Sequence, residues 1–219
     1  MYEPSLEPAT IGPVLHDPSL PRLYAYHRAL VDAERAGVGI VTSGGLAALL
    51  GQTITSTQIR KDLSLLGALG RRGHGYGVEG LVRRLARVLG LDRQWRIGIV
   101  GFGYLGHALA RFLSAREERY SIAAIYDVAP DVVGQVWNGI TVRNIADLET
   151  TLGPAGCTIG VVAVPTAVAQ ESAERLVRGG IEAIFNFAPI PLRVAGTVAV
   201  RNIDLAGEMS ILTHYLGGR

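Results

Sequence analysis

Residues 97–106 read Ile-Gly-Ile-Val-Gly-Phe-Gly-Tyr-Leu-Gly, a short apolar run that opens into the pattern G-x-G-x-x-G. Where a buried strand passes directly into a helix, this pattern is typical of the first turn of a dinucleotide-binding α/β fold. Gly101 permits the tight turn, Gly103 lets a pyrophosphate approach backbone amides, and Gly106 lets the helix lie close to the strand. The predicted loop also contains Phe102, Tyr104 and Leu105.

An acidic residue follows at the distance that such a fold requires. Asp127 ends the next apolar run, 21 residues after Gly106. Its carboxylate can accept hydrogen bonds from the ribose hydroxyls of NAD and would repel a 2′-phosphate, so NADH and NAD+ are favoured over their phosphorylated counterparts. The alternative is an unoccupied glycine turn beside an exposed aspartate, because the pattern alone is weak in a chain with 28 glycines.

The second half of the chain alternates apolar strands with helices. The expected strands are 97–100, 122–126, 158–164, 183–187 and 198–200, and the expected helices are 104–114, 145–152 and 167–179. Such strands predict a parallel sheet covered on both faces, a Rossmann-type α/β domain. A last apolar stripe, spaced for a helix, consists of Leu205, Met209, Leu212 and Leu216.

Two further turns are expected at the far wall of the ligand cleft, since ligands of open α/β sheets lie at the carboxyl ends of the strands. These turns are Val164-Pro165 and Asn186-Phe187-Ala188-Pro189. Asn186 is expected to hydrogen-bond polar ligand groups, with Phe187 or Pro189 as apolar cover. The alternative is ordinary turn chemistry at both places.

The first half predicts a helical domain. Asp17-Pro18 is expected to start a helix that ends at Gly37, Thr42-Ser43 to cap a helix over 44–50, and Thr55 to begin a third helix that ends at Gly67. Two short helices joined by a tight turn form a helix-turn-helix. Residues 70–78 alternate glycine with basic or aromatic residues, which favours a two-stranded wing, and 79–89 resumes a helical pattern.

Positive charge is concentrated in this helical half. Residues 1–96 hold 12 basic and 8 acidic side chains, although the net charge of the whole chain is only +2. A basic winged helix predicts contact with double-stranded DNA, through the third helix in the major groove and the wing at the phosphates or the minor groove. Asp62 is expected to orient Arg60 or Lys61, and the alternative for the whole surface is a solvated basic face. The predicted DNA-binding residues are Ser43, Gln58, Arg60, Lys61, Ser64, Arg71, Arg72, His74 and Tyr76.

Several classes of protein are excluded by composition. No apolar run reaches the roughly 18 residues of a membrane span, and the first twenty residues lack a basic-then-apolar export signal, so the expected location is the cytoplasm. The single cysteine, Cys157, rules out an internal disulfide, and the five histidines show no metal-ligand spacing.

The chain also contains five longer motifs, IRKDLS (59–64), GRRGHGYGV (70–78), GLDRQW (90–95), NFAPIPL (186–192) and NIDLAGE (202–208). Through these motifs the chain resembles the Rex family of redox-sensing transcriptional repressors. Residues 1–16 are rich in proline and glycine without apolar periodicity, which predicts a mobile arm. The resemblance implies an α/β architecture with a DNA-binding winged helix (17–92), a Rossmann domain for NADH or NAD+ (93–203) and a C-terminal helix (204–219) exchanged within a homodimer. It implies a repressor that binds pseudo-palindromic operators when free or with NAD+ and releases them with NADH.

The resemblance also implies a switch. Asp204 matches an aspartate that contacts an arginine of the N-terminal domain in one state, and Arg28 matches that arginine. The chain departs from the family at Phe112, where a tyrosine often bonds the switch aspartate, and at Leu205, where a phenylalanine commonly lies near the nicotinamide.

Two other functional classes stay open at the level of sequence. A dehydrogenase with an incidental basic domain is disfavoured, because no lysine follows Lys61 and only about 113 residues follow Gly106, too few for a separate substrate domain. A nucleic-acid-binding scaffold with a vestigial nucleotide fold would show no response to NADH.

Overall fold

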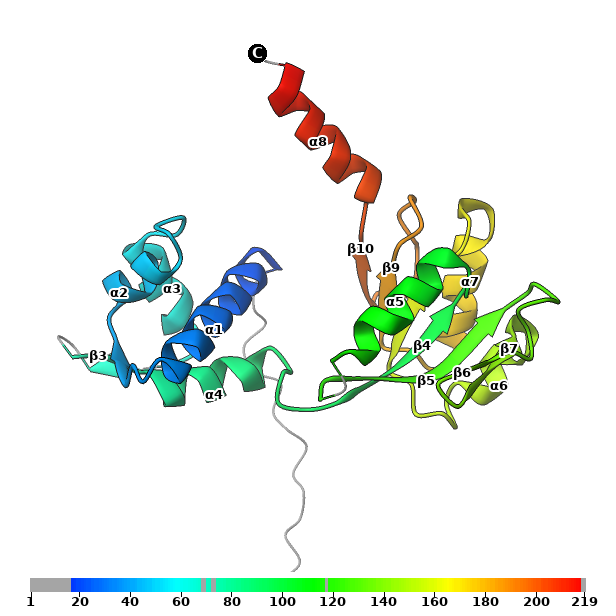
Figure 1. Ribbon diagram of the computed structural model, residues 1–219, viewed down its shortest axis with the longest axis horizontal. Coiled ribbons are helices and arrows are strands. Elements are labelled where there is room, and N and C mark those ends of the chain that lie inside the picture. Colours follow the sequence, from blue (N-terminus) through cyan, green and yellow to red (C-terminus); the bar gives the residue numbers. More distant parts are fainter. Residues whose placement is uncertain (1–16, 68–69, 72–73, 117, 218–219) are drawn as a thin grey trace, which may run out of the picture. The chain divides into compact units, whose positions relative to one another are not determined.

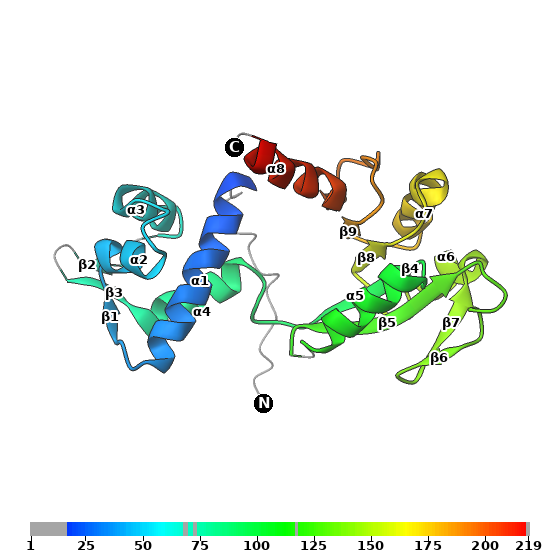
Figure 2. The ribbon, with the colours of Figure 1, turned by 45° about the horizontal axis from the view of Figure 1, so that its top comes forward.

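The chain divides into two units, residues 1–92 and 93–219 (Figures 1 and 2). Each unit has its own buried hydrophobic residues. The computed structural model describes all residues except 1–16, 68–69, 72–73, 117 and 218–219. The predicted mobile arm, 1–16, therefore lies outside the described residues. Among the residues that are described, no helix is both long and apolar enough to cross a lipid bilayer.

The described residues of unit 1 form four α-helices and a small sheet. The helices are α1 (Leu20–Arg35), α2 (Ser43–Leu49), α3 (Ser56–Ser64) and α4 (Val78–Val88). The Oγ1 atom of Thr42 accepts the Gly45 N–H at 3.0 Å and that of Thr55 accepts the Gln58 N–H at 3.2 Å, so each short helix begins at a threonine cap. Leucines and isoleucines of all four helices form one buried cluster.

The start of the first helix differs from the prediction. Asp17–Ser19 form a 3-10 turn, η1, and α1 begins only at Leu20, with Pro21 in its first turn. Proline suits that position, because the first amides of a helix have no acceptor within it. Asp17 is therefore not the cap of α1.

The small sheet has the antiparallel order β1-β3-β2, with strands β1 (Ile40–Val41), β2 (Gly70–Arg71) and β3 (Gly75–Gly77). The hairpin of β2 and β3 is the wing expected from the glycine pattern. Strand β1 was not expected, since two residues are too few to show a period of two.

Unit 2 is built on a seven-stranded sheet in the order β10-β9-β8-β4-β5-β7-β6, parallel except for β6. Its strands are β4 (Trp95–Val100), β5 (Tyr120–Asp127), β6 (Val136–Trp137), β7 (Ile140–Asn144), β8 (Ile159–Val162), β9 (Ala183–Asn186) and β10 (Ala199–Asn202). Its helices are α5 (Tyr104–Ser114), η2 (Ile145–Asp147), α6 (Leu148–Thr151), α7 (Thr166–Arg178) and α8 (Leu205–Gly217).

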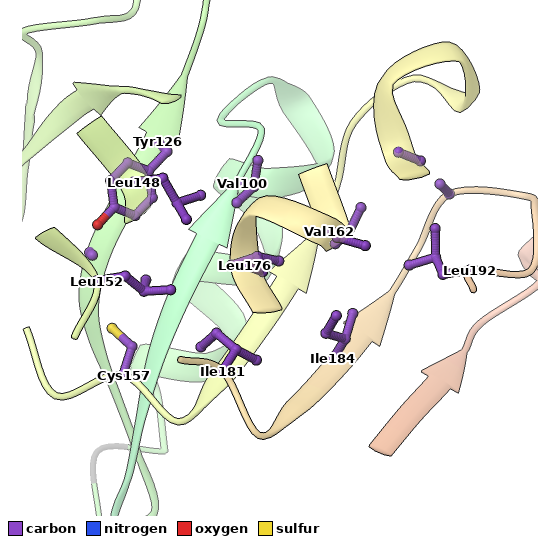
Figure 3. Packing of buried hydrophobic residues seen from close by; sticks show 14 residues of the cluster. Val100, Tyr126, Leu148, Leu152, Cys157, Val162, Leu176, Ile181, Ile184 and Leu192 are labelled. Atoms are coloured by element: carbon purple, nitrogen blue, oxygen red, sulfur yellow. The ribbon is translucent and has the colours of Figure 1, made fainter. Parts of the chain in front are cut away.

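Helices cover both faces of this sheet. On one face, Leu148 and Leu152 from the α6 segment and Leu176 from α7 belong to one buried cluster with Val100, Val162 and Ile184 of the strands (Figure 3). The apolar residues of α5 pack with a second cluster on the other face. The fully apolar strands thus have the two-sided burial that their composition predicts.

Part of the sheet was missed at the level of sequence. The hairpin of β6 and β7 was unexpected, because β7 lies near the sheet edge and only Val142 of its five residues is buried. The expected helix over 145–152 is a 3-10 turn followed by the short α6, and the expected strand over 158–164 is limited to β8.

Candidate functional site

The glycine turn between β4 and α5 holds two glycines that the fold itself requires. Gly101 has φ +89°, and a Cβ there would collide with the Ala163 carbonyl and lie 2.7 Å from Cγ1 of Val164. A Cβ at Gly106 would collide with the Gly101 carbonyl oxygen. These two positions therefore have a structural reason to be glycine that involves no ligand.

Gly103 is different, because no neighbour among the described residues requires it to be glycine. Its backbone is extended, with φ −71° and ψ −163°, and a Cβ there would meet no atom within 4 Å. It precedes α5 without a side-chain cap, so the first amides of the helix remain available to an anion. Tyr104 and Leu105, which follow it, are exposed.

Phe102 of the predicted loop contributes its backbone to the turn and its side chain to the core. Its side chain is only 7% exposed and lies in the core, with its ring centroid 5.2 Å from that of His107 and 6.1 Å from that of Trp137. Only its backbone belongs to the turn.

Asp127 lies beside the glycine turn, at the end of β5. Its Oδ2 accepts the Phe102 N–H at 2.6 Å, and its Oδ1 accepts the N–H groups of Val128 and Ala129 at 2.7 and 2.9 Å. The carboxylate is thereby fixed at the carboxyl end of the sheet, one strand away from Gly101.

A cleft of about 400 Å³ opens between these elements. It is lined by Val100, Gly101, Gly103, Asp127, Val128, Ile145, Ala163, Val164, Pro165, Val168, Glu171, Ser172 and Arg175. The predicted residues Gly101, Gly103, Asp127, Val164 and Pro165 are therefore brought together. The lining is mostly apolar, which suits a flat aromatic base beside a carboxylate that can accept hydrogen bonds from a sugar.

Sequence reasoning missed the apolar and α7 side of the cleft. Val168, Ser172 and Arg175 recur at spacings of four and three along α7, so they share one helix face. That spacing was a usable signal. The contribution of Val128 and Ile145 was visible only in the structure, because neither belongs to a recognisable motif.

Asn186 is not placed as predicted. It is fully buried, and its Nδ2 donates to Ile190 O and Asn202 Oδ1, both at 2.8 Å, and to Ala188 O at 3.2 Å. Its Oδ1 accepts the Ala188 N–H at 3.0 Å. With these contacts Asn186 shapes the loop after β9, and both of its side-chain polar atoms are bonded within the protein.

The other residues of that loop differ in exposure. Ala188 is buried, Pro189 is exposed, and Phe187 is half-buried with its ring centroid 4.5 Å from that of Phe185. Phe187 and Pro189 thus keep apolar surface outside the core.

In unit 1, the exposed face of α3 carries Arg60, Lys61 and Ser64. The Arg60 guanidinium donates to Ser43 Oγ at 3.1 Å and to Thr57 Oγ1 at 3.0 Å, which brings the start of α2 and the outer face of α3 together. The Ser64 hydroxyl donates to the Lys61 carbonyl at 2.7 Å.

Asp62 corrects a prediction. It orients neither Arg60 nor Lys61, but is buried on the inner face of α3 and accepts from Nε and Nη2 of Arg22, from the Tyr26 hydroxyl and from Nε2 of Gln58, all at 2.7–2.8 Å. Burial by itself would raise the pKa of this carboxyl, but the hydrogen bonds from Arg22, Tyr26 and Gln58 hold the pKa below its usual value. Gln58, predicted to read DNA, is therefore bonded inward through its amide nitrogen.

The wing is partly described. The backbone of Arg71 lies in β2, His74 is exposed at the turn, and Tyr76 of β3 is half-buried against the core of unit 1. Arg72 lies outside the described residues. Over the part of the chain that the structure covers, no group of three or more His, Cys, Asp or Glu side chains could hold a metal ion.

Comparison with known proteins places this chain in a family. A family model described as "CoA binding domain" matches residues 92–190, and one described as "Putative DNA-binding protein N-terminus" matches residues 17–64. The redox-sensing transcriptional repressor Rex of Desulfitobacterium hafniense is 39% identical over 198 residues, which cover 90% of this chain and 93% of that protein. The Rex of Streptomyces coelicolor is 40% identical over 208 residues, covering 95% of this chain and 80% of that protein. The chain belongs to the Rex family of redox-sensing transcriptional repressors.

Solved structures of RSP, a Rex-family repressor, share the fold of both units. A crystal structure of RSP in complex with β-NAD+ and operator DNA is 32% identical and matches with a TM-score of 0.88, covering 94% of each chain. A structure of RSP with β-NADH matches with a TM-score of 0.81, covering 94% of this chain and 96% of that one. The predicted fold class, a winged-helix domain followed by a Rossmann domain, is confirmed.

The residues matched to the Rex switch have these positions. Arg28 is exposed on α1, and Asp204 precedes α8, where its Oδ1 accepts the Gly207 N–H at 2.8 Å as a helix cap. Phe112 is 56% exposed, with the Arg116 guanidinium carbon 3.9 Å from its ring centroid. Leu205 is 56% exposed at the start of α8. The switch role of each stays a prediction.

Proposed function

We propose that this chain is a homodimeric transcriptional repressor that binds operator DNA when free or with NAD+ and releases the DNA on binding NADH. The observation that carries the nucleotide-binding part of the proposal is Gly103, an extended glycine in open space at the start of α5 and at the edge of the cleft. The fold gives no reason for glycine at this position. A ligand that approaches the backbone closely would explain it, because only glycine leaves room there.

The residues present suit a dinucleotide. The amides at the start of α5 would bind the pyrophosphate, and Asp127 would accept from the adenosine ribose. Val128, Ile145 and Val168 would enclose the adenine. The negative charge of Asp127 disfavours a ribose that carries a 2′-phosphate.

Discrimination between NADH and NAD+ rests on charge. The dihydronicotinamide is neutral and the oxidised ring is a cation, so an apolar environment near Phe187 and Leu205 would hold the reduced ring better. A ligand shifts a conformational equilibrium only by its difference in affinity for the two states. This preference is therefore what can drive DNA release.

The DNA would contact the exposed face of α3 and the wing. Arg60 and Lys61 can reach base edges and phosphates, and Ser43, held by Arg60, lies at the start of α2, where a backbone phosphate would be stabilised.

The dimer would form through α8. Its apolar residues are exposed in the single chain, with Met209 at 61% and Leu216 at 69%. A helix of this composition is stable in water only when another surface covers it. We propose that this surface belongs to the second subunit, as the Rex resemblance implies.

We also infer that the chain acts in the cytoplasm, has no enzymatic turnover and uses NADH only as a signal.

The test is a titration of a labelled duplex with the protein, in the presence of NADH or NAD+. The duplex is the one that the wild-type chain selects from a library with a randomised core. We expect release at saturating NADH and retention with NAD+. Binding that NADH leaves unchanged would refute the proposal, and oxidation of NADH by a panel of carbonyl substrates would show an enzyme instead.

The switch has a matched pair of variants. Asp204→Asn keeps an oxygen that can cap α8 but removes the charge, and Arg28→Ala removes the predicted partner. Both should shift the NADH concentration for half-release in the same direction, while Asp32→Asn on the exposed surface of α1 should not. Shifts of the half-release concentration in opposite directions would show that Asp204 and Arg28 do not act as a pair.

A further inference from the structure

A buried polar cluster connects α1 with the helix that is proposed to read DNA. Asp62 of α3 is 2% exposed and receives four hydrogen bonds of 2.7–2.8 Å, three from Arg22 and Tyr26 on α1 and one from Gln58 on α3. The Arg22 guanidinium binds both carboxylate oxygens, a geometry that fixes orientation as well as distance. Tyr26 is fully buried.

A buried ion pair is by itself weak evidence that the charges are there for stability. Replacing a buried ion pair by apolar side chains is often neutral or favourable, because the desolvation of the charges offsets their attraction. Such a cluster contributes more clearly to the placement of one element against another. Here the element is a helix of nine residues, too short to hold a fixed position without tertiary contacts.

We propose that Asp62, held by Arg22 and Tyr26, is the positioning residue that sets the sequence specificity of α3. It fixes α3 on α1, and it holds Gln58 one helical turn away, so that Arg60 and Lys61 face outward in one arrangement. This inference rests on the proposed DNA-binding function of α3.

Two kinds of DNA contact depend differently on the position of α3. Phosphate contacts depend on the charges of Arg60 and Lys61 and tolerate small displacements, whereas base contacts need a fixed position of the helix. Loosening the cluster should therefore weaken binding to a preferred sequence while affinity for unrelated DNA changes little.

The variants are Asp62→Asn and Tyr26→Phe. The first keeps the shape and removes the charge, and the second removes only the hydroxyl that donates to Asp62. Asp32→Asn is the matched control, because it makes the same chemical and charge change at an exposed position of α1, where Asp32 pairs with Arg35 at 3.6 Å. Arg22→Lys keeps the charge but cannot bind both oxygens, and should give an intermediate effect.

The measurement is the affinity of each full-length variant for two duplexes, the one selected by the wild-type chain and a scrambled one of equal composition, together with the melting temperature. We expect the ratio of the two affinities to fall about tenfold for Asp62→Asn, the effect of losing a hydrogen bond to a charged group, and less for Tyr26→Phe. Asp32→Asn should leave the ratio unchanged.

The outcomes separate the inference from the proposed function. If the wild-type chain prefers no sequence, the proposed function fails. The inference is overturned if the wild-type chain is specific but Asp62→Asn and Tyr26→Phe, both folded, keep the wild-type ratio of the two affinities. Equal losses of affinity for both duplexes give that same result. Should Asp62→Asn not fold, Tyr26→Phe decides by the same criterion.

Discussion

The difference between Gly101 and Gly103 gives a direct test of the nucleotide site. Gly103→Ala introduces a Cβ that meets no atom within 4 Å, in a backbone conformation open to any residue. Folding stability should therefore stay the same or rise by about 0.4–1 kcal/mol, from the lower entropy of the unfolded chain. The added methyl group should instead block the approach of a pyrophosphate to the amides of the turn.

The expected loss in binding follows from the bonds at stake. A hydrogen bond to a charged group contributes about 1.5–3 kcal/mol, so displacing one phosphate oxygen should raise the Kd for NADH about 10- to 100-fold. Gly101→Ala is the contrasting variant. Its φ of +89° and its collision with Ala163 should cost about 2–5 kcal/mol of folding stability, the sum of backbone strain and overpacking.

Two measurements check these expectations, NADH fluorescence on titration with protein and urea unfolding of both variants. Gly103→Ala should lose NADH binding with its stability intact. The reasoning is refuted if Gly103→Ala binds NADH as the wild type does, or if it is destabilised as much as Gly101→Ala.

Four further predictions concern other parts of the chain. The pKa of Asp62 is lowered in the folded state, so the stabilisation by its carboxylate is present above the unfolded pKa of about 3.9 and is lost as the pH falls through the folded pKa. In urea titrations, the difference in unfolding free energy between wild type and Asp62→Asn should therefore shrink from about pH 7 to about pH 3. A constant difference would contradict this. Burial raises the pKa of the Cys157 thiol to about 11. A disulfide reagent at about pH 8 should therefore label the native protein at least roughly a hundredfold more slowly than the unfolded protein. Equal labelling rates would show that Cys157 is accessible. Asn186→Ala should cost about 1–3 kcal/mol or more by leaving buried groups unpaired, whereas lost NADH binding at unchanged stability would restore a ligand-facing role. Leu212→Glu on α8 should shift the mass in sedimentation equilibrium from that of a dimer to that of a monomer. Thr213→Glu is the control for the added charge. A dimer that persists in Leu212→Glu would exclude α8 as the dimer interface.

The elements that the sequence predicted well share a physical cause. Strand β4, the glycine turn and α5 are specified locally, because Gly101 has φ +89° and a Cβ at Gly106 would collide with the carbonyl oxygen of Gly101, only five residues away. The threonine caps of α2 and α3 are local for the same reason, since each cap bonds an amide three residues away. Short-range rules suffice where both partners of a contact lie within a few residues.

The sequence by itself therefore determined the α/β and winged-helix organisation, the glycine turn and the candidate charge of the cleft at Asp127. Only the tertiary structure decided which side chains face which way. Asn186 lies in a loop that resembles a ligand contact, yet its amide bonds Asn202 from the neighbouring strand. Asp62 lies among cations in sequence, yet its partners Arg22 and Tyr26 are 40 and 36 residues away. A polar side chain bonds the groups that folding brings within about 3 Å of it, and separation along the chain does not reveal those groups.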